Sequence, residues 1–137
     1  MRTKAELNER LRKYAGWEWV YEEGRGYLVW RWATGDNIEF LFIEVAERRK
    51  GYGTELFRAM VRRLEARGER PYHSVFGYRL DKNAEAEVFY RSMGFVQQLI
   101  GSRDSWPSLE PTRSIYGGDG TVVMWIAWDD LKRNLGI

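Results

Sequence analysis

The sequence predicts one α/β (α+β) domain, and three observations lead to this prediction. A chain of 137 residues suits a single hydrophobic core. Hydrophobic residues make up 44% of the chain, and the seven Trp, eight Tyr and six Phe supply ample volume for that core. Segments with the two-residue period of strands alternate along the chain with segments that have the period of helices. We therefore treat residues 1–137 as one domain.

The chain is predicted to begin with a helix and an antiparallel meander. The helix covers residues 3–15, with Thr3 placed as its N-cap and apolar side chains at helical spacing. From Trp17 the pattern changes to the alternation of a strand, and two further strands follow over residues 27–33 and 38–45. Turns rich in Gly, Asp and Asn separate these strands, so we expect short hairpin connections between them.

The second half of the chain is predicted to mix two helices with three strands. Leu56, Met60 and Leu64 recur every four residues and define the longer of the two helices. The predicted elements are, in order, a helix ending at Gly68, a strand over residues 71–79, a short helix capped by Asp81 or Asn83, and strands over residues 95–100 and 121–128.

A long polar segment, residues 101–120, separates the last two predicted strands. It is rich in Gly, Pro, Ser and charged residues, and it is longer than a hairpin connection needs to be. We interpret it as an inserted loop, which is either a functional flap or partly disordered.

The composition excludes or disfavours several classes of protein. The chain has no Cys, which excludes disulfides, zinc–thiolate sites and Cys nucleophiles. A single histidine, His73, disfavours a His-based metal site and a Ser–His–Asp hydrolase, so we expect no metal. A net charge of +2 is too balanced to indicate nucleic acid or a membrane by itself. Because neither a signal peptide nor an apolar run of roughly 20 residues is present, we expect a cytoplasmic protein without membrane contact.

The junction between the third strand and the long helix is the strongest candidate for a binding site. A buried strand runs into Gly51-Tyr52-Gly53-Thr54, and the helix starts there. The N–H groups of a first helical turn, together with the helix dipole, favour an anion, so a phosphate or pyrophosphate is the most economical ligand. Neither a Walker P-loop nor G-x-G-x-x-G fits the residues. The alternative is that the two glycines only shape a tight turn.

Two motifs give this site a family context. Residues 48–53, Arg-x-x-Gly-x-Gly, resemble the [QR]-x-x-G-x-[GA] motif of the GCN5-related N-acetyltransferases, the GNAT family. Residues 83–95 resemble that family's second signature, N-x-x-A-x-x-x-Y-x-x-x-G-F. The resemblance covers roughly residues 26–100. It implies a mixed, mostly antiparallel sheet flanked by helices, and acetyl-CoA as the cofactor.

The resemblance also implies roles for individual residues. Backbone groups of Val45 would contact the pantetheine arm where two strands separate, and Asn83 would contact the cofactor near the start of its helix. Tyr90 would donate a proton or a hydrogen bond to the leaving thiolate; its alternative role is a helix aromatic packed beneath the sheet. The pyrophosphate would be surrounded, chiefly by main-chain N–H groups, at Arg48, Arg49, Gly51, Gly53 and Thr54.

Two glutamates are candidates for the general base. Glu39 lies six residues before Val45 and resembles the glutamate that serves as base in the histone-modifying members of the family. Glu44 has the opposite parity, so a regular strand would present only one of the two to the cleft, although a bulge would change that count. Each could instead be a solvent-facing strand residue.

The chain departs from the family pattern at two places. A single helix precedes Trp17, where the family usually has a strand and two helices, so the N-terminal region is shortened. Residues 101–120 lie where many members border the acceptor groove, and Trp106, Arg113 and Tyr116 could rebuild the wall that the short N-terminal region does not supply.

The predicted function is transfer of an acetyl group from acetyl-CoA to a primary amine, by direct attack in a ternary complex. The acceptor would be a small molecule or a protein, and the enzyme a monomer or a homodimer. One alternative is a non-catalytic CoA-binding or interaction module. Another is an acyltransferase for an amine carried by nucleic acid. The nucleic acid would bind a basic stripe on the long helix, and the alternative is that this stripe is only a solvated face: Arg58, Arg62, Arg63 and Arg67.

Overall fold

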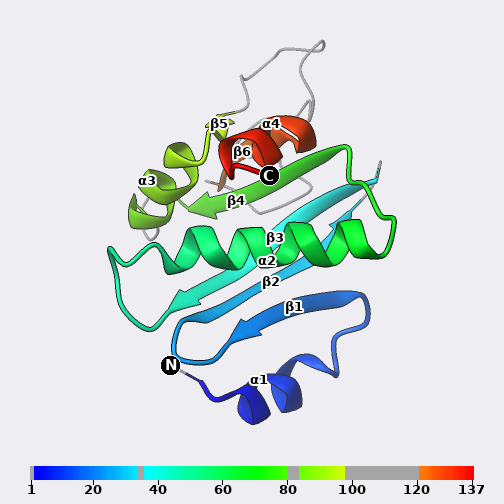
Figure 1. Cartoon of the computed structure of the whole chain (residues 1–137), viewed down its shortest axis with the longest axis vertical. Helices are drawn as coiled ribbons and strands as arrows, with labels where there is room; N and C mark the ends of the chain where they lie inside the picture. Colours follow the sequence, from blue (N-terminus) through cyan, green and yellow to red (C-terminus); the bar gives the residue numbers. More distant parts are fainter. Residues whose placement is uncertain (1, 34–35, 80–83, 98–120) are drawn as a thin grey trace.

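The protein is built around one six-stranded sheet with the strand order β1-β2-β3-β4-β6-β5 (Figure 1). The computed structural model describes residues 2–33, 36–79, 84–97 and 121–137. The elements are α1 (Lys4–Leu11), β1 (Trp17–Glu22), β2 (Gly26–Ala33), β3 (Asn37–Val45), α2 (Tyr52–Ala66), β4 (His73–Arg79), α3 (Ala84–Ser92), β5 (Val96–Gln97), β6 (Thr121–Ala127) and α4 (Trp128–Asn134).

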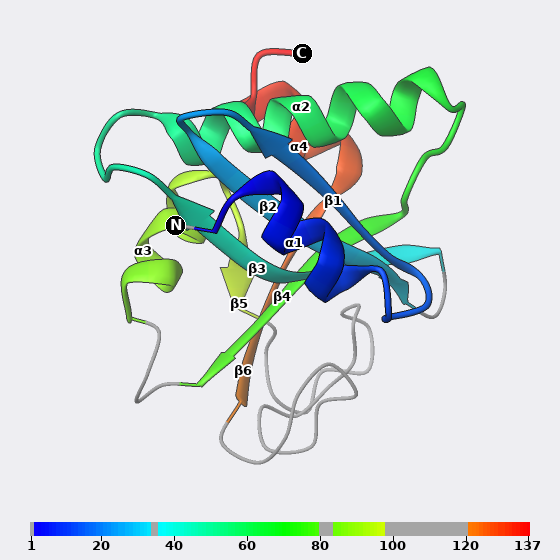
Figure 2. The same cartoon turned by 90° about the horizontal axis from the view of Figure 1, so that it is seen from below.

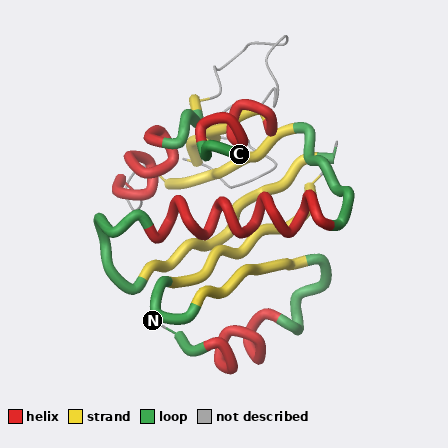
Figure 3. Tube along the Cα trace, in the orientation of Figure 1, coloured by secondary structure: helices red, strands yellow, loops and turns green. Residues whose placement is uncertain are grey.

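The sheet is mixed and mostly antiparallel, which confirms the predicted fold class. Strands β1, β2 and β3 form the expected meander, and β6 pairs antiparallel with both β4 and β5. Among the strands that the structure describes, only β3 and β4 pair in parallel. A parallel pair needs a crossover connection, and helix α2 supplies it by running across the sheet between the two strands (Figure 3).

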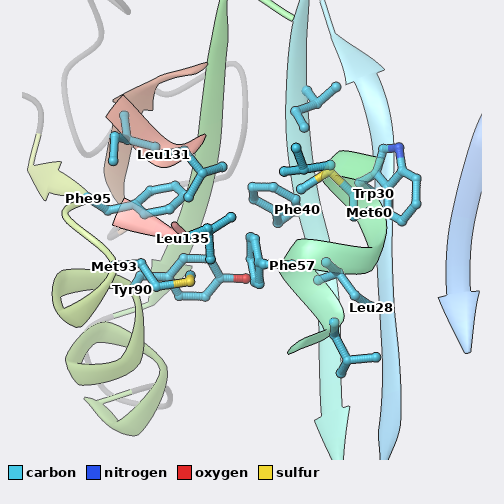
Figure 4. Packing of buried hydrophobic residues seen from close by; sticks show 14 of the residues in the cluster. Leu28, Trp30, Phe40, Phe57, Met60, Tyr90, Met93, Phe95, Leu131 and Leu135 are labelled. Atoms are coloured by element: carbon cyan, nitrogen blue, oxygen red, sulfur yellow. The ribbon is translucent and has the colours of Figure 1, made fainter. Parts of the chain in front are cut away.

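The helices divide between the two faces of the sheet. Helices α2, α3 and α4 contribute side chains to the main core on one face, and α1 packs on the other face (Figure 2). Helix α1 places Leu7 and Leu11 on Tyr27 and Val29 of β2. The main core includes the largest fully buried side chains, some of which are labelled in Figure 4: Leu28, Trp30, Phe40, Phe57, Met60, Tyr90 and Phe95.

Helix α1 is shorter than predicted. Its N-cap is confirmed, because Thr3 Oγ1 accepts a hydrogen bond of 3.2 Å from the Glu6 backbone N–H. The helix ends at Leu11 rather than near residue 15, and the chain then turns toward β1. The Tyr14 ring stacks on Trp17 with 4.1 Å between ring centroids, so Tyr14 faces the start of β1 instead of continuing the helix.

Helix α4 was not predicted, because the last strand was expected to run to Trp128. Trp128 instead begins α4, and Trp128, Leu131 and Leu135 are buried in the main core. A signal was present in the sequence: acidic residues fall in the first turn and basic residues in the last, as the helix dipole favours.

The remaining boundaries agree with the predictions within a few residues. Strand β4 begins at His73 rather than at residue 71, and β5 is described only over Val96–Gln97. The proposed caps Asp81 and Asn83 and the loop of residues 101–120 lie outside the described residues. None of the helices in the described ranges is long and apolar enough to cross a membrane.

Candidate active site

Strands β3 and β4 form a fork beside the N-terminal end of α2. They are paired only through Ile38–Ser74, Glu39–Val75 and Phe40–Phe76. Beyond Phe40, β3 continues to Val45 and β4 to Arg79, and within the described residues no later pair joins them. Figure 1 shows the far ends of the two strands apart. The backbone groups of β3 that face the fork are therefore available to a ligand.

A β-bulge in β3 lies where the fork opens. Val29 of β2 pairs with Phe42 and the next residue, Trp30, pairs with Phe40, so Leu41 is an extra residue in β3. An extra residue bends its strand and ends regular pairing, which accounts for the fork beginning directly after Phe40.

The bulge also places both candidate glutamates on one face of the sheet. Glu44 is opposite Tyr27, which belongs to the core on the α1 face, and Phe42 is opposite Val29 of the same core. Glu39 is opposite Arg31, two residues beyond Val29, so it shares that face. The parity of a regular strand, which allowed only one glutamate toward the cleft, does not hold here.

The Glu39 carboxylate is buried and held by an arginine from the neighbouring strand. Its side chain is 6% exposed, and Oε2 accepts hydrogen bonds of 3.0 and 3.2 Å from Nη2 and Nε of Arg31. Burial raises the pKa of Glu39 above its ordinary value, and Arg31 acts in the opposite direction. Arg31 was not among the predicted site residues. The hairpin of strands 27–33 and 38–45 was predicted, so only the pairing register of these two strands was missing to place Arg31 opposite Glu39.

The Glu44 carboxylate accepts a hydrogen bond from the hydroxyl of Tyr27. Burial and this carboxylate raise the pKa of Tyr27, whereas the nearby Arg2 side chain lowers it. Tyr27 therefore stays protonated at neutral pH and keeps its role as a donor to Glu44.

The connection from β3 to α2 has the geometry of an anion site. Arg49 and Gly51 both have left-handed backbone angles, with φ of 62° and 76°. Gly51 is the N-cap of α2 and provides no side-chain cap. The N–H groups of the first turn of a helix have no acceptor within the helix, so this end of α2 is open to a ligand. Arg48, Arg49 and Lys50 are exposed beside it and add positive charge.

Gly51 and Gly53 meet different constraints. A Cβ at Gly51 would meet nothing within 4 Å, so only its φ demands glycine. A Cβ at Gly53 would lie 2.6 Å from Cζ of Phe89, so Gly53 lets α3 pack against the first turn of α2. This contact supports the alternative in which Gly53 shapes the packing. Thr54, the next residue, is half-buried.

Tyr90 lies at the fork, on the face of the sheet that α2 and α3 cover. Its ring is 1% exposed and packs edge-on against Phe57 and Phe95, with centroids at 5.9 and 5.0 Å. It also lies 6.2 Å from Phe40, the last residue of β3 that pairs with β4. Its hydroxyl points toward Phe57 (Figure 4). Burial raises the pKa of this hydroxyl well above its ordinary value.

Gly26 is a residue of the site that the sequence identified only as part of a turn. It pairs with Val45, and a Cβ there would overlap the carbonyl oxygen of Glu44 and lie 2.9 Å from Val45 Cα. Its φ is 153°. The end of β3, which the resemblance assigns to the pantetheine arm, can therefore approach β2 this closely only because residue 26 is glycine.

Two other predicted features can be placed in part. Asn83 lies outside the described residues. Of the basic stripe on α2, three arginines bind groups of the protein itself. Arg58 donates to the Leu135 carbonyl at 2.8 Å, Arg63 to the Trp19 carbonyl, and Arg67 to the Glu18 carboxylate.

Comparisons with known proteins identify the family and the fold of the chain. A family model described as an acetyltransferase (GNAT) domain matches residues 15–97, which is more than half of the chain. The comparison with curated protein sequences found no match.

Several solved structures have the same fold. The ribosomal-protein-S18-alanine N-acetyltransferase of Escherichia coli is 20% identical, with a TM-score of 0.54 over 90% of this chain and 76% of that one. A Bacillus subtilis acetyltransferase in complex with CoA is 18% identical, with a TM-score of 0.55 over 91% and 84%. Ard1 of Thermoplasma volcanium is 21% identical, with a TM-score of 0.56 over 92% and 80%. At these identities the likeness concerns the fold.

We predict that Gly26→Ala destabilises the protein more than Gly24→Ala. Both glycines have positive φ, but a Cβ at Gly24 meets nothing within 4 Å, whereas at Gly26 it meets the β3 backbone. Gly24→Ala should cost about 1 kcal/mol for the backbone conformation alone, and Gly26→Ala roughly 2–4 kcal/mol. Urea denaturation followed by circular dichroism measures both, and equal losses would contradict the close approach of β2 and β3.

Proposed function

The chain belongs to the GNAT acetyltransferase family, and from this premise we propose that it transfers the acetyl group of acetyl-CoA to a primary amine in a ternary complex. The fork between β3 and β4 is the observation that carries the proposal. It joins an anion site at one end to a tyrosine on one face of the sheet and a buried glutamate on the other. Acetyl-CoA would supply the activated acetyl thioester.

The residues for the cofactor fit its charges. The open N-terminal turn of α2, with Arg48, Arg49, Gly51 and Thr54 around it, would hold the pyrophosphate through N–H groups and positive charge. The β3 backbone from the bulge to Val45 would hydrogen-bond the pantetheine arm and polarise the thioester carbonyl. We assign Gly53 chiefly to packing against Phe89, and Asn83 keeps its role as a predicted contact.

Glu39 is the favoured general base. A lysine-like amine has a pKa near 10.4, so only about one molecule in 2,500 is neutral at pH 7 and a proton acceptor is needed. Glu39 pairs with β4 one residue before the fork opens, and Arg31 fixes its orientation. Burial raises its pKa, which makes its carboxylate a stronger base than an exposed glutamate. Glu44 lies at the outer end of β3 and is the second candidate.

Tyr90 would stabilise the leaving thiolate by a hydrogen bond. A thiol has an ordinary pKa near 8.5 and a tyrosine one near 10. Burial raises the pKa of Tyr90 further, so complete transfer of its proton to a thiolate would be uphill. A protonated hydroxyl in an apolar environment is instead a strong donor to a developing negative charge.

The two alternatives differ in their support. A CoA-binding module without turnover would need the pyrophosphate site at the start of α2 but would not need Glu39 or Tyr90. It therefore predicts that substitutions at these two residues leave the affinity for acetyl-CoA unchanged and that there is no turnover to lose. The alternative with an acceptor carried by nucleic acid relies on the basic stripe of α2. Three of its arginines, Arg58, Arg63 and Arg67, already bind groups of the protein itself. We therefore favour a small-molecule or protein amine as the acceptor. A cytoplasmic monomer or homodimer stays a prediction.

The proposed pyrophosphate site at the N-terminal turn of α2 can be tested with one charged variant of Gly51 and its neutral isostere. Asp and Asn both tolerate the left-handed conformation at Gly51, and a Cβ there has open space. Gly51→Asp should weaken acetyl-CoA binding at least about 10-fold by repelling the pyrophosphate, while Gly51→Asn should stay within a few-fold of wild type. Calorimetric titration measures both. If Asp and Asn weaken binding equally, charge at this helix end does not hold the cofactor.

Tyr90→Phe distinguishes an enzyme from a binding module. Removing one hydroxyl from the aromatic cluster preserves the ring contacts with Phe40, Phe57 and Phe95. We expect kcat to fall about 10- to 100-fold, with the Kd for acetyl-CoA unchanged. Release of free CoA thiol in an acceptor screen provides the rate. Unchanged turnover would assign Tyr90 to the core alone, whereas a wild-type protein that binds acetyl-CoA but releases no CoA thiol with any acceptor would be a binding module.

The pH dependence of kcat/KM identifies the base. Because the pKa of Glu39 is raised, activity should be lost as pH falls through a value above the ordinary one near 4.5. Glu39→Gln should remove this acidic limb and lower kcat about 100-fold or more. Glu44→Gln, on the same face of the same strand, is the matched comparison and should keep the limb. The reverse result would transfer the role of base to Glu44.

A further inference from the structure

A small hollow lies on the α1 face of the sheet, next to the outer half of β3. It is lined by Arg2, Arg10, Leu11, Tyr27 and Phe42. Its lining residues come from α1, from the residue before the N-cap of α1, and from the paired strands β2 and β3; Figure 2 shows α1 lying over this face of the sheet. Phe42 is 48% exposed, although it is a large apolar residue in the middle of a sheet.

Positive charge predominates at the hollow, because two arginines line it and one carboxylate, that of Glu44, lies beside it on the hydroxyl of Tyr27. Arg2 and Arg10 both line it, and Arg10 makes no ion pair with any residue that the structure describes. By contrast, Arg12, two residues further along, binds Glu9 at 2.9 Å. Leu11 is buried and Phe42 and Tyr27 contribute rings, so the two guanidinium groups stand beside apolar surface that lowers the local dielectric. Such a setting favours a carboxylate or phosphate with an apolar stem.

The hollow and Glu39 lie on the same face of β3. On the α1 face of β3, Glu39 is followed by Leu41, the extra residue of the bulge, which packs against the α1-face core, and then by Phe42 and Glu44. Phe42 therefore belongs both to the hollow and to the strand segment that follows the base candidate. A group bound in the hollow lies along β3 from Glu39, on the same side of the sheet.

We propose that this hollow binds an anionic group of the acceptor, so that the acceptor is a primary amine that also carries a carboxylate or phosphate. The proposal rests on the proposed function. In the reaction, the amine nitrogen forms a bond to the acetyl carbon and the carbon–sulfur bond breaks. Glu39 takes one proton from the ammonium form of the amine, the nitrogen loses its second proton to the departing CoA thiolate that Tyr90 stabilises, and the products are the amide and CoA thiol. A polyamine, with further positive charges, would be repelled by Arg2 and Arg10.

The test compares acceptors that differ only in the anionic group. Rates of CoA release are measured with 4-aminobutanoate against butylamine, phosphoethanolamine against ethanolamine, and putrescine as the cationic acceptor. A short acidic peptide with one lysine, against the same peptide with Gln in place of Glu, distinguishes a protein source of the anion from a small molecule. Wild-type protein should prefer the anionic member of a pair by about 10-fold or more in kcat/KM.

Variants on one helix provide the matched control. Arg10→Gln should abolish the preference by raising KM for the anionic acceptor, with the KM for butylamine and the calorimetric Kd for acetyl-CoA unchanged. Arg12→Gln, also on the exposed side of this segment but outside the hollow, should keep the preference. Arg2→Gln should reproduce the effect of Arg10→Gln.

Two results would overturn the inference, and they are distinguishable. If acetyl-CoA binds and butylamine or putrescine reacts as well as the anionic amines, the acceptor class is wrong while the proposed function stands. If acetyl-CoA does not bind to wild-type protein at millimolar concentration, both the proposed function and the inference that rests on it fail.

Discussion

The site depends on one extra residue in β3. Leu41 interrupts the register between β2 and β3, and the pairing of β3 with β4 stops at the residue before it. The same insertion reverses the alternation of side chains, so that Glu39 and Glu44 share a face while Phe40 and Val45 point into the main core on the other. A regular strand would keep β4 paired along its length and would place one glutamate among the aromatic side chains of the core, where a charge is costly. The bulge thus determines where β3 and β4 separate and makes one face of the sheet at this fork acidic and the other apolar.

The opening is kept in place by contacts among the three helices on the core face. Phe89 of α3 packs into the space that Gly53 leaves at the first turn of α2. Helix α4 connects the same two helices, because Arg58 donates to the Leu135 carbonyl and Asn134 Nδ2 donates to the Met93 carbonyl at 2.9 Å. Leu131 and Leu135 add apolar burial next to Tyr90. The tyrosine is therefore positioned by packing on every side rather than by its place on α3 alone, and a helix outside both sequence motifs contributes to that packing.

The limits of the sequence-based prediction follow from the range of the interactions involved. Periodicity and turn residues predicted the meander, the long helix and the order of elements, because these depend on neighbours a few residues apart. The N-cap at Thr3 was predictable for the same reason. The bulge was not, since Leu41 is an ordinary strand residue and only the pairing with β2 shows it to be extra. Gly26 and Arg31 act through residues 8 to 19 positions away in the chain, on the partner strand, so their roles required the register as well. Helix α4 was missed because the pattern at Trp128 was attributed to the strand before it.

In the proposed reaction, the two titratable groups on the two faces of the fork have opposite tasks. Both Tyr90 and Glu39 have pKa values raised by burial, but the consequence differs because one is neutral and the other negative when ready to act. For Tyr90, burial among aromatic rings keeps the hydroxyl protonated and strengthens its donation to a nearby negative charge. For Glu39, burial alone would favour the neutral acid, which is no base; the two hydrogen bonds from Arg31 counter that effect and keep the carboxylate available. The arginine on β2 is thus as necessary to the proposed chemistry as the glutamate it holds. An apolar residue opposite Glu39 would remove this opposing effect and shift the balance further toward the neutral acid, which would weaken the proposed proton acceptor without touching the proposed pyrophosphate site.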